Sequence, residues 1–92
     1  MTTPSPDAPR PSRSLDALLA IALEAARQGG TACAVMNGAN EAAVAKFLAD
    51  EIGFYDIPRL VRKAMDAVPF VEKPGLEQIL EADRLARIAA AE

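Results

Sequence analysis

Histidine and tryptophan are both absent from this 92-residue chain, and Cys33 is its single cysteine. Without histidine, the chain lacks the side chain that most often serves as general base and as metal ligand near neutral pH. One cysteine excludes an internal disulfide, and with no histidine to activate it we expect Cys33 to be a small, buried or half-buried core residue. Most enzyme chemistry is therefore disfavoured, although carboxylates alone can hold Mg²⁺.

A basic excess and long apolar runs are also lacking. The net charge is -3, from 10 basic and 13 acidic residues, and no basic cluster is interleaved with aromatic residues, so nucleic acid is not an expected partner. No apolar run approaches the roughly 20 residues that span a bilayer, and the start of the chain has no apolar signal-peptide core. We therefore expect a soluble, cytoplasmic protein with no membrane partner.

What the chain does contain is alanine-rich helical sequence after a proline-rich start. Residues 1–13 hold four of the seven prolines and are predicted to form a disordered tail, since this composition cannot build a packed core. The alternative is a polyproline ligand, for which Pro6 to Pro9 is the single P-x-x-P match. Residues 14–92 are predicted to form one small domain.

Capping and periodicity predict the first two helices. The first begins at Ser14 as N-cap and ends at Gln28, because Gly29-Gly30 can close a helix in the left-handed conformation. Its predicted buried stripe consists of Leu15, Leu18, Leu19, Ala22 and Ala26. The second helix begins early, after Thr31, or later, with Asn37 as its cap, and an early start is favoured. Its end is predicted between Asp50 and Gly53.

The third and fourth helices have clearer signals. Asp56 is predicted to cap the third helix, whose buried stripe is Ile57, Leu60, Val61, Ala64, Met65 and Val68. Gly75 is predicted to precede a final helix from Leu76 to about Ala90. Four helices joined by short connections, with no credible strand, predict an all-α fold, a small four-helix bundle.

Polar side chains interrupt the apolar patterns of the second and fourth helices. Asn37, Asn40 and Glu41 fall on the helical face of Val44, Phe47 and Leu48, and Asp83 lies among apolar residues, with Arg87 one turn later to pair with it. A buried polar group needs partners. We expect these five residues to form a structural polar network between the two helices; the alternative is a small-molecule or metal site. No catalytic, cofactor-binding or metal-binding residue is predicted.

Four motifs in order carry a family resemblance. They are L-x-x-A-L-E-A-A-R-Q-G-G-T-A, V-M-N-G-A-N-E-A-A-V-A-K-F-L, I-G-F-Y-D-I-P and L-E-A-D-R-L-A-R. Together they resemble the C-terminal helical domain of 1-deoxy-D-xylulose 5-phosphate reductoisomerase, over about Leu15 to Arg87. The chain departs from the family pattern at Ala26, Cys33, Met36, Gly38 and Ala42, and glycine in place of alanine at position 38 weakens the helix by about 1 kcal/mol.

The resemblance implies a non-catalytic role for this chain. In the family, NADPH and a divalent metal serve the rearrangement and reduction of deoxyxylulose phosphate in isoprenoid synthesis, and the domains that bind them have no counterpart in these 92 residues. Asn37, Asn40 and Glu41 match a segment that is structural in the family. We therefore expect a non-catalytic docking or self-association module, a homo-oligomer or a partner of other protein domains, a reductoisomerase among them. The alternative is a ligand-binding module that uses the polar network.

Overall fold

The computed structural model describes residues 11–92, with side chains from residue 15 onward. It contains α1 (Pro11–Gln28), α2 (Ala32–Leu48), α3 (Asp56–Ala67) and α4 (Leu76–Ala91). No strand occurs in this range, so the predicted all-α fold is confirmed. Residues 1–10 of the predicted tail lie outside the described range. None of the described helices is long and apolar enough to cross a membrane.

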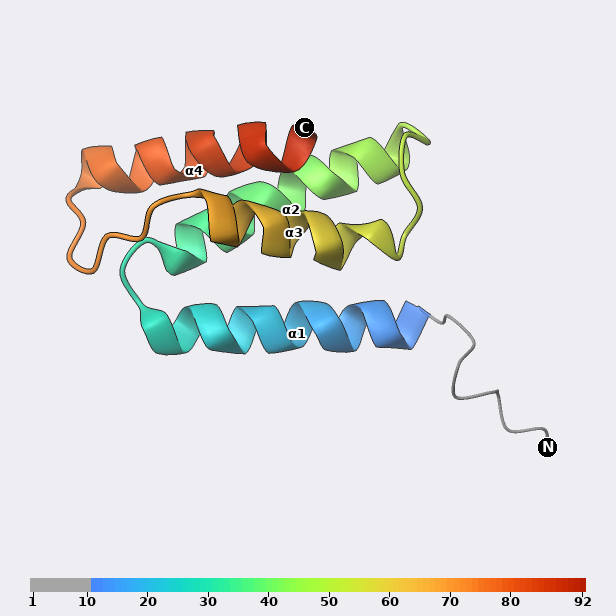
Figure 1. Ribbon diagram of the computed structural model, residues 1–92, viewed down its shortest axis with the longest axis horizontal. Coiled ribbons are helices and arrows are strands. Elements are labelled where there is room, and N and C mark those ends of the chain that lie inside the picture. Colours follow the sequence, from blue (N-terminus) through green and yellow to red (C-terminus); the bar gives the residue numbers. More distant parts are fainter. Residues whose placement is uncertain (1–10) are drawn as a thin grey trace.

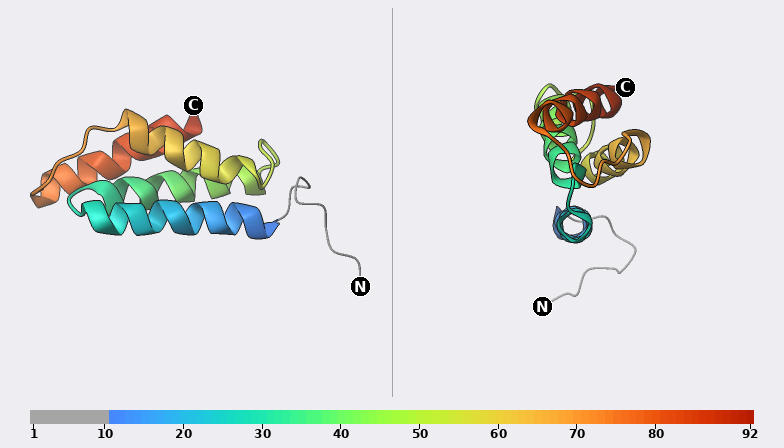
Figure 2. Two further views of the ribbon diagram at one scale, coloured as in Figure 1. Left: turned by 60° about the horizontal axis from the view of Figure 1, so that its bottom comes forward. Right: turned by 90° about the vertical axis from the view of Figure 1, so that its left-hand side faces the viewer.

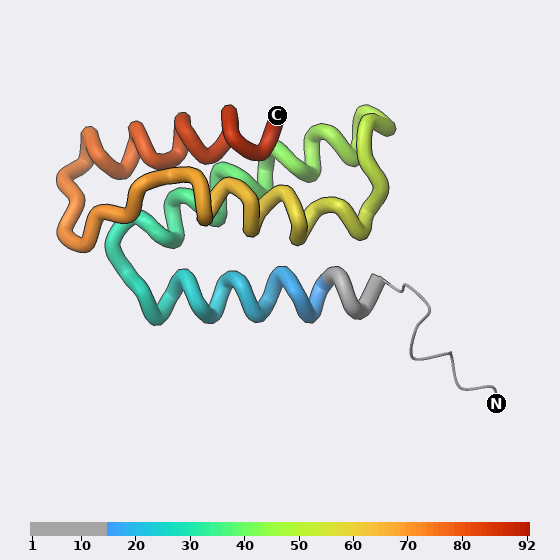
Figure 3. Tube along the Cα trace, viewed as in Figure 1, coloured from blue at the N-terminus to red at the C-terminus, as the bar shows by residue number. Residues whose placement is uncertain are grey.

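The helices form an up-down bundle with α2 at its centre (Figure 1). The chain reverses direction at each of its three connections, as the backbone trace shows (Figure 3). Helix α2 contacts all three other helices, and α4 packs chiefly against it. Helix α1 packs against α2 and α3 at one edge and does not touch α4, which lies on the other side (Figure 2).

Small side chains dominate the core. Val61 is the largest apolar side chain that is fully buried, and alanines from α2, α3 and α4 belong to the same core cluster. The fully buried alanines of the core are Ala39, Ala43, Ala64, Ala86 and Ala90. Because alanine lets helix axes approach closely, the bundle is held by tight backbone packing more than by bulky side chains.

Helix α1 differs from its prediction in both start and phase. It begins at Pro11, three residues before the predicted cap Ser14, since proline loses no intrahelical hydrogen bond in the first turn. Its buried side chains are Ile21 and Ala25, whereas Leu15 and Leu19 are 58% and 59% exposed. The predicted stripe was wrong for Leu15, Leu19 and Ala26, while Leu18 and Ala22 are partly buried and Leu18 packs against the core. The apolar side of α1 is wider than the face that packs, so periodicity alone does not fix which residues are buried.

Helix α2 has the predicted early start but a different buried face. It runs from Ala32 to Leu48 and so ends before the predicted Asp50, which itself takes a left-handed turn conformation at φ 60°. The buried face is formed by Ala32, Val35, Gly38, Ala39 and Ala43. The face predicted from Val44, Phe47 and Leu48 is only partly covered, and Leu48 is 74% exposed. Small residues, rather than the larger apolar ones, face the bundle because α4 comes so close.

Helices α3 and α4 follow their predictions within one residue. All predicted stripe residues of α3 are buried except Met65, which is partly buried. Asp56 is the first helical residue instead of the cap, and its carboxylate accepts a hydrogen bond from the Gly53 N–H at 2.9 Å. Gly75 precedes α4 as predicted, with its N–H bonded to the Gln78 side chain at 2.9 Å.

A pair of hydrogen bonds joins the α1–α2 turn to the loop before α4. The fully buried Thr31 donates its backbone N–H to the Val71 carbonyl, and its hydroxyl accepts the Val71 N–H, both at 3.0 Å. Gly30 makes this approach possible: it has φ +54°, and a Cβ there would overlap the Val71 carbonyl oxygen. The Gly-Gly-Thr sequence therefore does more than end α1, because it fixes the α3–α4 loop.

The two hydrogen bonds between Thr31 and Val71 are called the Thr31 clasp below, and replacing Gly30 by alanine tests it. We expect a loss of about 3 kcal/mol in the free energy of unfolding, from the left-handed backbone and the collision with Val71. Gly29→Ala is the matched control: its φ is +68°, but nothing lies within 4 Å of the added Cβ, so the loss is about 1 kcal/mol. Urea unfolding monitored by circular dichroism compares the two, and equal losses contradict the clasp.

One ion pair attaches α1 to α3. The Glu24 carboxylate accepts hydrogen bonds from both terminal nitrogens of Arg62, at 2.8 and 3.2 Å. The hydrogen bond and the charge of Arg62 lower the pKa of Glu24 below its ordinary value. Since α1 buries few side chains, this bidentate pair is a specific contact that sets where α1 lies.

The lowered pKa of Glu24 predicts a pH-dependent contribution to stability. A carboxylate with a lower pKa in the folded state adds stability above its unfolded pKa, and this is lost as pH falls through the folded value. Glu24→Gln is therefore expected to melt below the parent at pH 7, with the gap closing below about pH 4. Thermal melts in low salt measure this. Glu77→Gln is the control, since Glu77 is exposed and forms no ion pair within the described residues, and a constant gap for Glu24→Gln opposes the assignment.

Candidate functional site

Three of the five predicted polar residues meet between α2 and α4. Arg87 donates from Nη2 to Glu41 Oε2 at 2.5 Å and from Nε to Asp83 Oδ2 at 3.0 Å. Asp83 and Arg87 are one turn apart on α4, and Glu41 reaches them from α2. Arg87 therefore bridges the two helices through a pair of carboxylates.

Asn37 and Asn40 do not join this bridge. Asn37 is exposed on α2 and makes no hydrogen bond to the other four residues. Asn40 is half-buried, and its Oδ1 atom is buried without a hydrogen-bond partner among the described residues. Both asparagines were assigned to the network because the buried face of α2 was predicted in the wrong phase.

The bridge leaves Arg87 firmly protonated. Its pKa is raised by its hydrogen bond to Asp83 and then by its hydrogen bond to Glu41. All three side chains are exposed to a third or more, so solvent screens the pairs and their individual contributions to stability are small. An arginine that stays charged and already binds two carboxylates is suited to holding helices in register and poorly suited to proton transfer.

Beneath this bridge, α2 and α4 make a very close contact at Gly38. A Cβ on Gly38 would lie 2.6 Å from Asp83 Oδ1 and 2.9 Å from the Asp83 carbonyl oxygen. Farther along the same contact, Lys46 Nζ donates to the Ala91 carbonyl oxygen at the end of α4, at 2.5 Å.

Gly38→Ala tests how closely the two helices approach. Helix propensity alone predicts a gain of about 1 kcal/mol, but the added methyl group has no room, and overpacking costs about 1–3 kcal/mol. We expect a net loss of stability, which is smaller but still present in an Asp83→Ala background, because that change removes Oδ1 and leaves the backbone carbonyl oxygen 2.9 Å from the added Cβ. Urea unfolding of the two single variants and the double variant gives the coupling energy. A Gly38→Ala protein more stable than the parent contradicts the contact.

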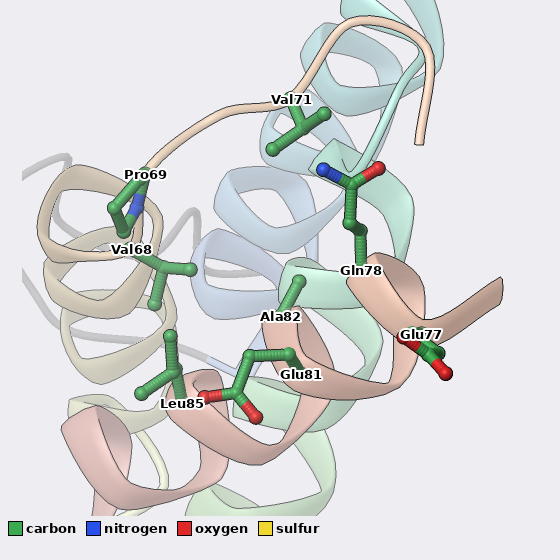
Figure 4. Close-up of a pocket in the computed structure, with 8 residues that line it drawn as sticks. All are labelled: Val68, Pro69, Val71, Glu77, Gln78, Glu81, Ala82 and Leu85. Carbon is green, nitrogen blue, oxygen red and sulfur yellow. The ribbon is translucent and has the colours of Figure 1, made fainter. Parts of the chain in front are cut away.

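A second feature is an apolar groove beside α4. The end of α3 and the following loop contribute Val68, Pro69 and Val71, and α4 contributes Ala82 and Leu85 (Figure 4). The groove encloses about 310 Å³, and Glu77, Gln78 and Glu81 complete its lining on α4. Sequence patterns could not show it, because it depends on where the Thr31 clasp holds the loop.

Cys33 and the carboxylates show no arrangement for chemistry in the described range. Cys33 is exposed on α2, so the expectation of a buried or half-buried core residue is wrong: Ala32 and Val35 form the buried face at this end of the helix. Within residues 15–92, no group of three or more cysteine or carboxylate side chains is placed to hold a metal ion. The described site features are thus a helix-bridging ion pair and an apolar groove.

The fold defines a small all-α helical domain. The sequence model of the family described as DXP reductoisomerase C-terminal domain matches residues 11–89 of this chain. The chain therefore belongs to the DXP reductoisomerase C-terminal domain family, as its motifs indicated. No solved structure matches it.

Individual relatives are whole reductoisomerases. The 1-deoxy-D-xylulose 5-phosphate reductoisomerase of Heliobacterium modesticaldum is 51% identical over 74 residues, which are 80% of this chain and 19% of that enzyme. The Leptospira interrogans enzyme is 49% identical over 69 residues, 75% of this chain and 18% of that enzyme. The chain thus spans less than a fifth of the curated relatives it matches.

Proposed function

We propose that this chain is a non-catalytic helical domain that docks on the other domains of a 1-deoxy-D-xylulose 5-phosphate reductoisomerase. The observation that carries the proposal is the apolar groove beside α4, in a chain that matches only the C-terminal fifth of such enzymes. The reaction, its NADPH and its divalent metal belong in this proposal to the docked partner. A cytoplasmic location is also part of it, in keeping with the exposed, unpaired thiol of Cys33.

The lining of the groove defines the kind of segment that binds there. Val68, Pro69 and Leu85 offer apolar contact, and carboxylates lie along one rim. Glu81 is paired with Arg84 of the same helix, whereas Glu77 forms no ion pair within the described residues. An apolar segment flanked by a basic residue complements both features.

A domain-exchange experiment tests docking. Residues 11–92 replace the equivalent domain in the Heliobacterium modesticaldum enzyme, which is 51% identical to this chain over 74 residues. The chimera is expected to keep reductoisomerase activity, and Leu85→Glu within it is expected to lower activity at least about tenfold, as burying a charge in an apolar contact does. Leu80→Glu on the same helix is the control for the added charge, because Leu80 is exposed and outside the groove, whereas Leu85 also packs partly against the core.

A charge-reversal variant of the chimera and an activity assay of the isolated chain also test the docking proposal. Glu77→Lys, an exposed change that leaves folding intact, is expected to weaken activity of the chimera by reversing the rim charge. The isolated chain is expected not to oxidise NADPH in the presence of deoxyxylulose phosphate and Mg²⁺. The proposal fails if the isolated chain turns over substrate, or if the Leu85→Glu and Leu80→Glu chimeras are equally active.

A further inference from the structure

Helix α1 presents an apolar face that no described part of the chain covers. Leu15, Leu19 and Leu23 are 58%, 59% and 50% exposed. Residues four apart on a helix advance by only 40°, so these three leucines form one continuous row on the outer side of α1. The side of α1 that packs on the bundle is the opposite one, with Ile21 and Ala25.

Two opposite charges lie on the same flank of this leucine row. Asp16 and Arg27 project 100° and 120° round the helix from Leu15, by the helical rotation of about 100° per residue. They are eleven residues apart, which is about 16 Å along the axis, so they lie near opposite ends of the row. Both are exposed, and neither forms an ion pair within the described residues.

This arrangement is complementary to itself. When two copies of a helix pack face to face and antiparallel, a two-fold axis keeps the same flanks together and reverses the order along the helix. Asp16 of each copy then lies opposite Arg27 of the other, and Leu19 lies opposite Leu23. In a parallel pair, the charged flank of one helix instead meets the alanine flank of the other, formed by Ala22 and Ala26, and neither charge is matched.

We propose that the leucine row of α1 is a self-association surface that binds the same row of a second copy in antiparallel orientation. Two features support a second copy as the occupant: the apolar row itself and the self-complementary charges at its ends. The surface is separate from the groove, since α1 and α4 do not touch (Figure 2). The inference therefore goes beyond the docking function, and failure of either leaves the other standing.

The size of the surface sets the strength of the association. An 18-residue helix is about 27 Å long, and one of its faces offers less than the roughly 800 Å² per partner that is usual in stable complexes. The dimer is therefore weak, with a Kd of about 100 µM. High protein concentration is needed to observe it.

Sedimentation equilibrium of the full chain from about 10 µM to about 1 mM tests the association. A monomer–dimer equilibrium is expected, and Leu19→Glu is expected to raise Kd at least about tenfold, since it places two charges in the apolar contact. Leu80→Glu, an equally exposed leucine on α4, is the control and leaves Kd unchanged. A chain that stays monomeric throughout, or a dimer that Leu19→Glu does not weaken, overturns the proposal.

Charge exchange tests the orientation. Asp16→Arg alone and Arg27→Asp alone each place like charges opposite one another, and each is expected to raise Kd about tenfold at low salt. An equimolar mixture of the two single variants restores both ion pairs and is expected to dimerise about as tightly as the parent. A mixture no tighter than its components contradicts the antiparallel arrangement. Binding of the leucine row to a reductoisomerase, with no dimer, assigns the surface to that partner instead and also overturns the proposal.

Discussion

The close approach of α2 and α4 is the contact on which the rest of the bundle depends. At Gly38 the backbone of one helix lies against Asp83 of the other, with space for no side-chain atom between them. The alanines of both helices extend this contact, so the core is thin and holds few large side chains. A thin core buries little apolar area, which leaves the bundle with apolar surface that its own helices cannot cover.

The loop before α4 forms one wall of the apolar groove. Thr31 holds Val71 through two hydrogen bonds, and Gly30 provides the space for that approach. The loop is thereby fixed at a set distance from α4, and the gap between them is the groove lined by Leu85 and Pro69. One short turn sequence thus ends α1, positions a loop forty residues away and maintains a candidate docking site.

How well the sequence predicts the buried face of a helix depends on how clearly its apolar and charged residues lie on opposite sides. Helix α3 has charged and apolar residues on opposite sides, and its buried stripe was predicted correctly except for Met65, which is half-covered. Helices α1 and α2 are apolar or alanine-rich on several sides, so the face that packs is decided by fit against neighbours and not by hydropathy. The prediction therefore chose Leu15 and Leu19, which are exposed, and missed Ile21 and Ala25, which are buried. The groove and the clasp join distant segments, and no local pattern encodes them.

The contact between Glu41 and Arg87 was predicted although the buried face of α2 was predicted incorrectly. The prediction that Glu41 points at the core does not hold, yet Glu41 meets Arg87 because the side chains are long and the helices are close. Because small residues line the contact between α2 and α4, the helices lie close enough for exposed side chains at its edge to reach across. Asn37 is exposed, and the Oδ1 atom of Asn40 is buried without a hydrogen-bond partner among the described residues, so neither takes part in the bridge. The bridge is therefore a consequence of tight helix packing, and it marks the edge of that contact rather than a place for chemistry.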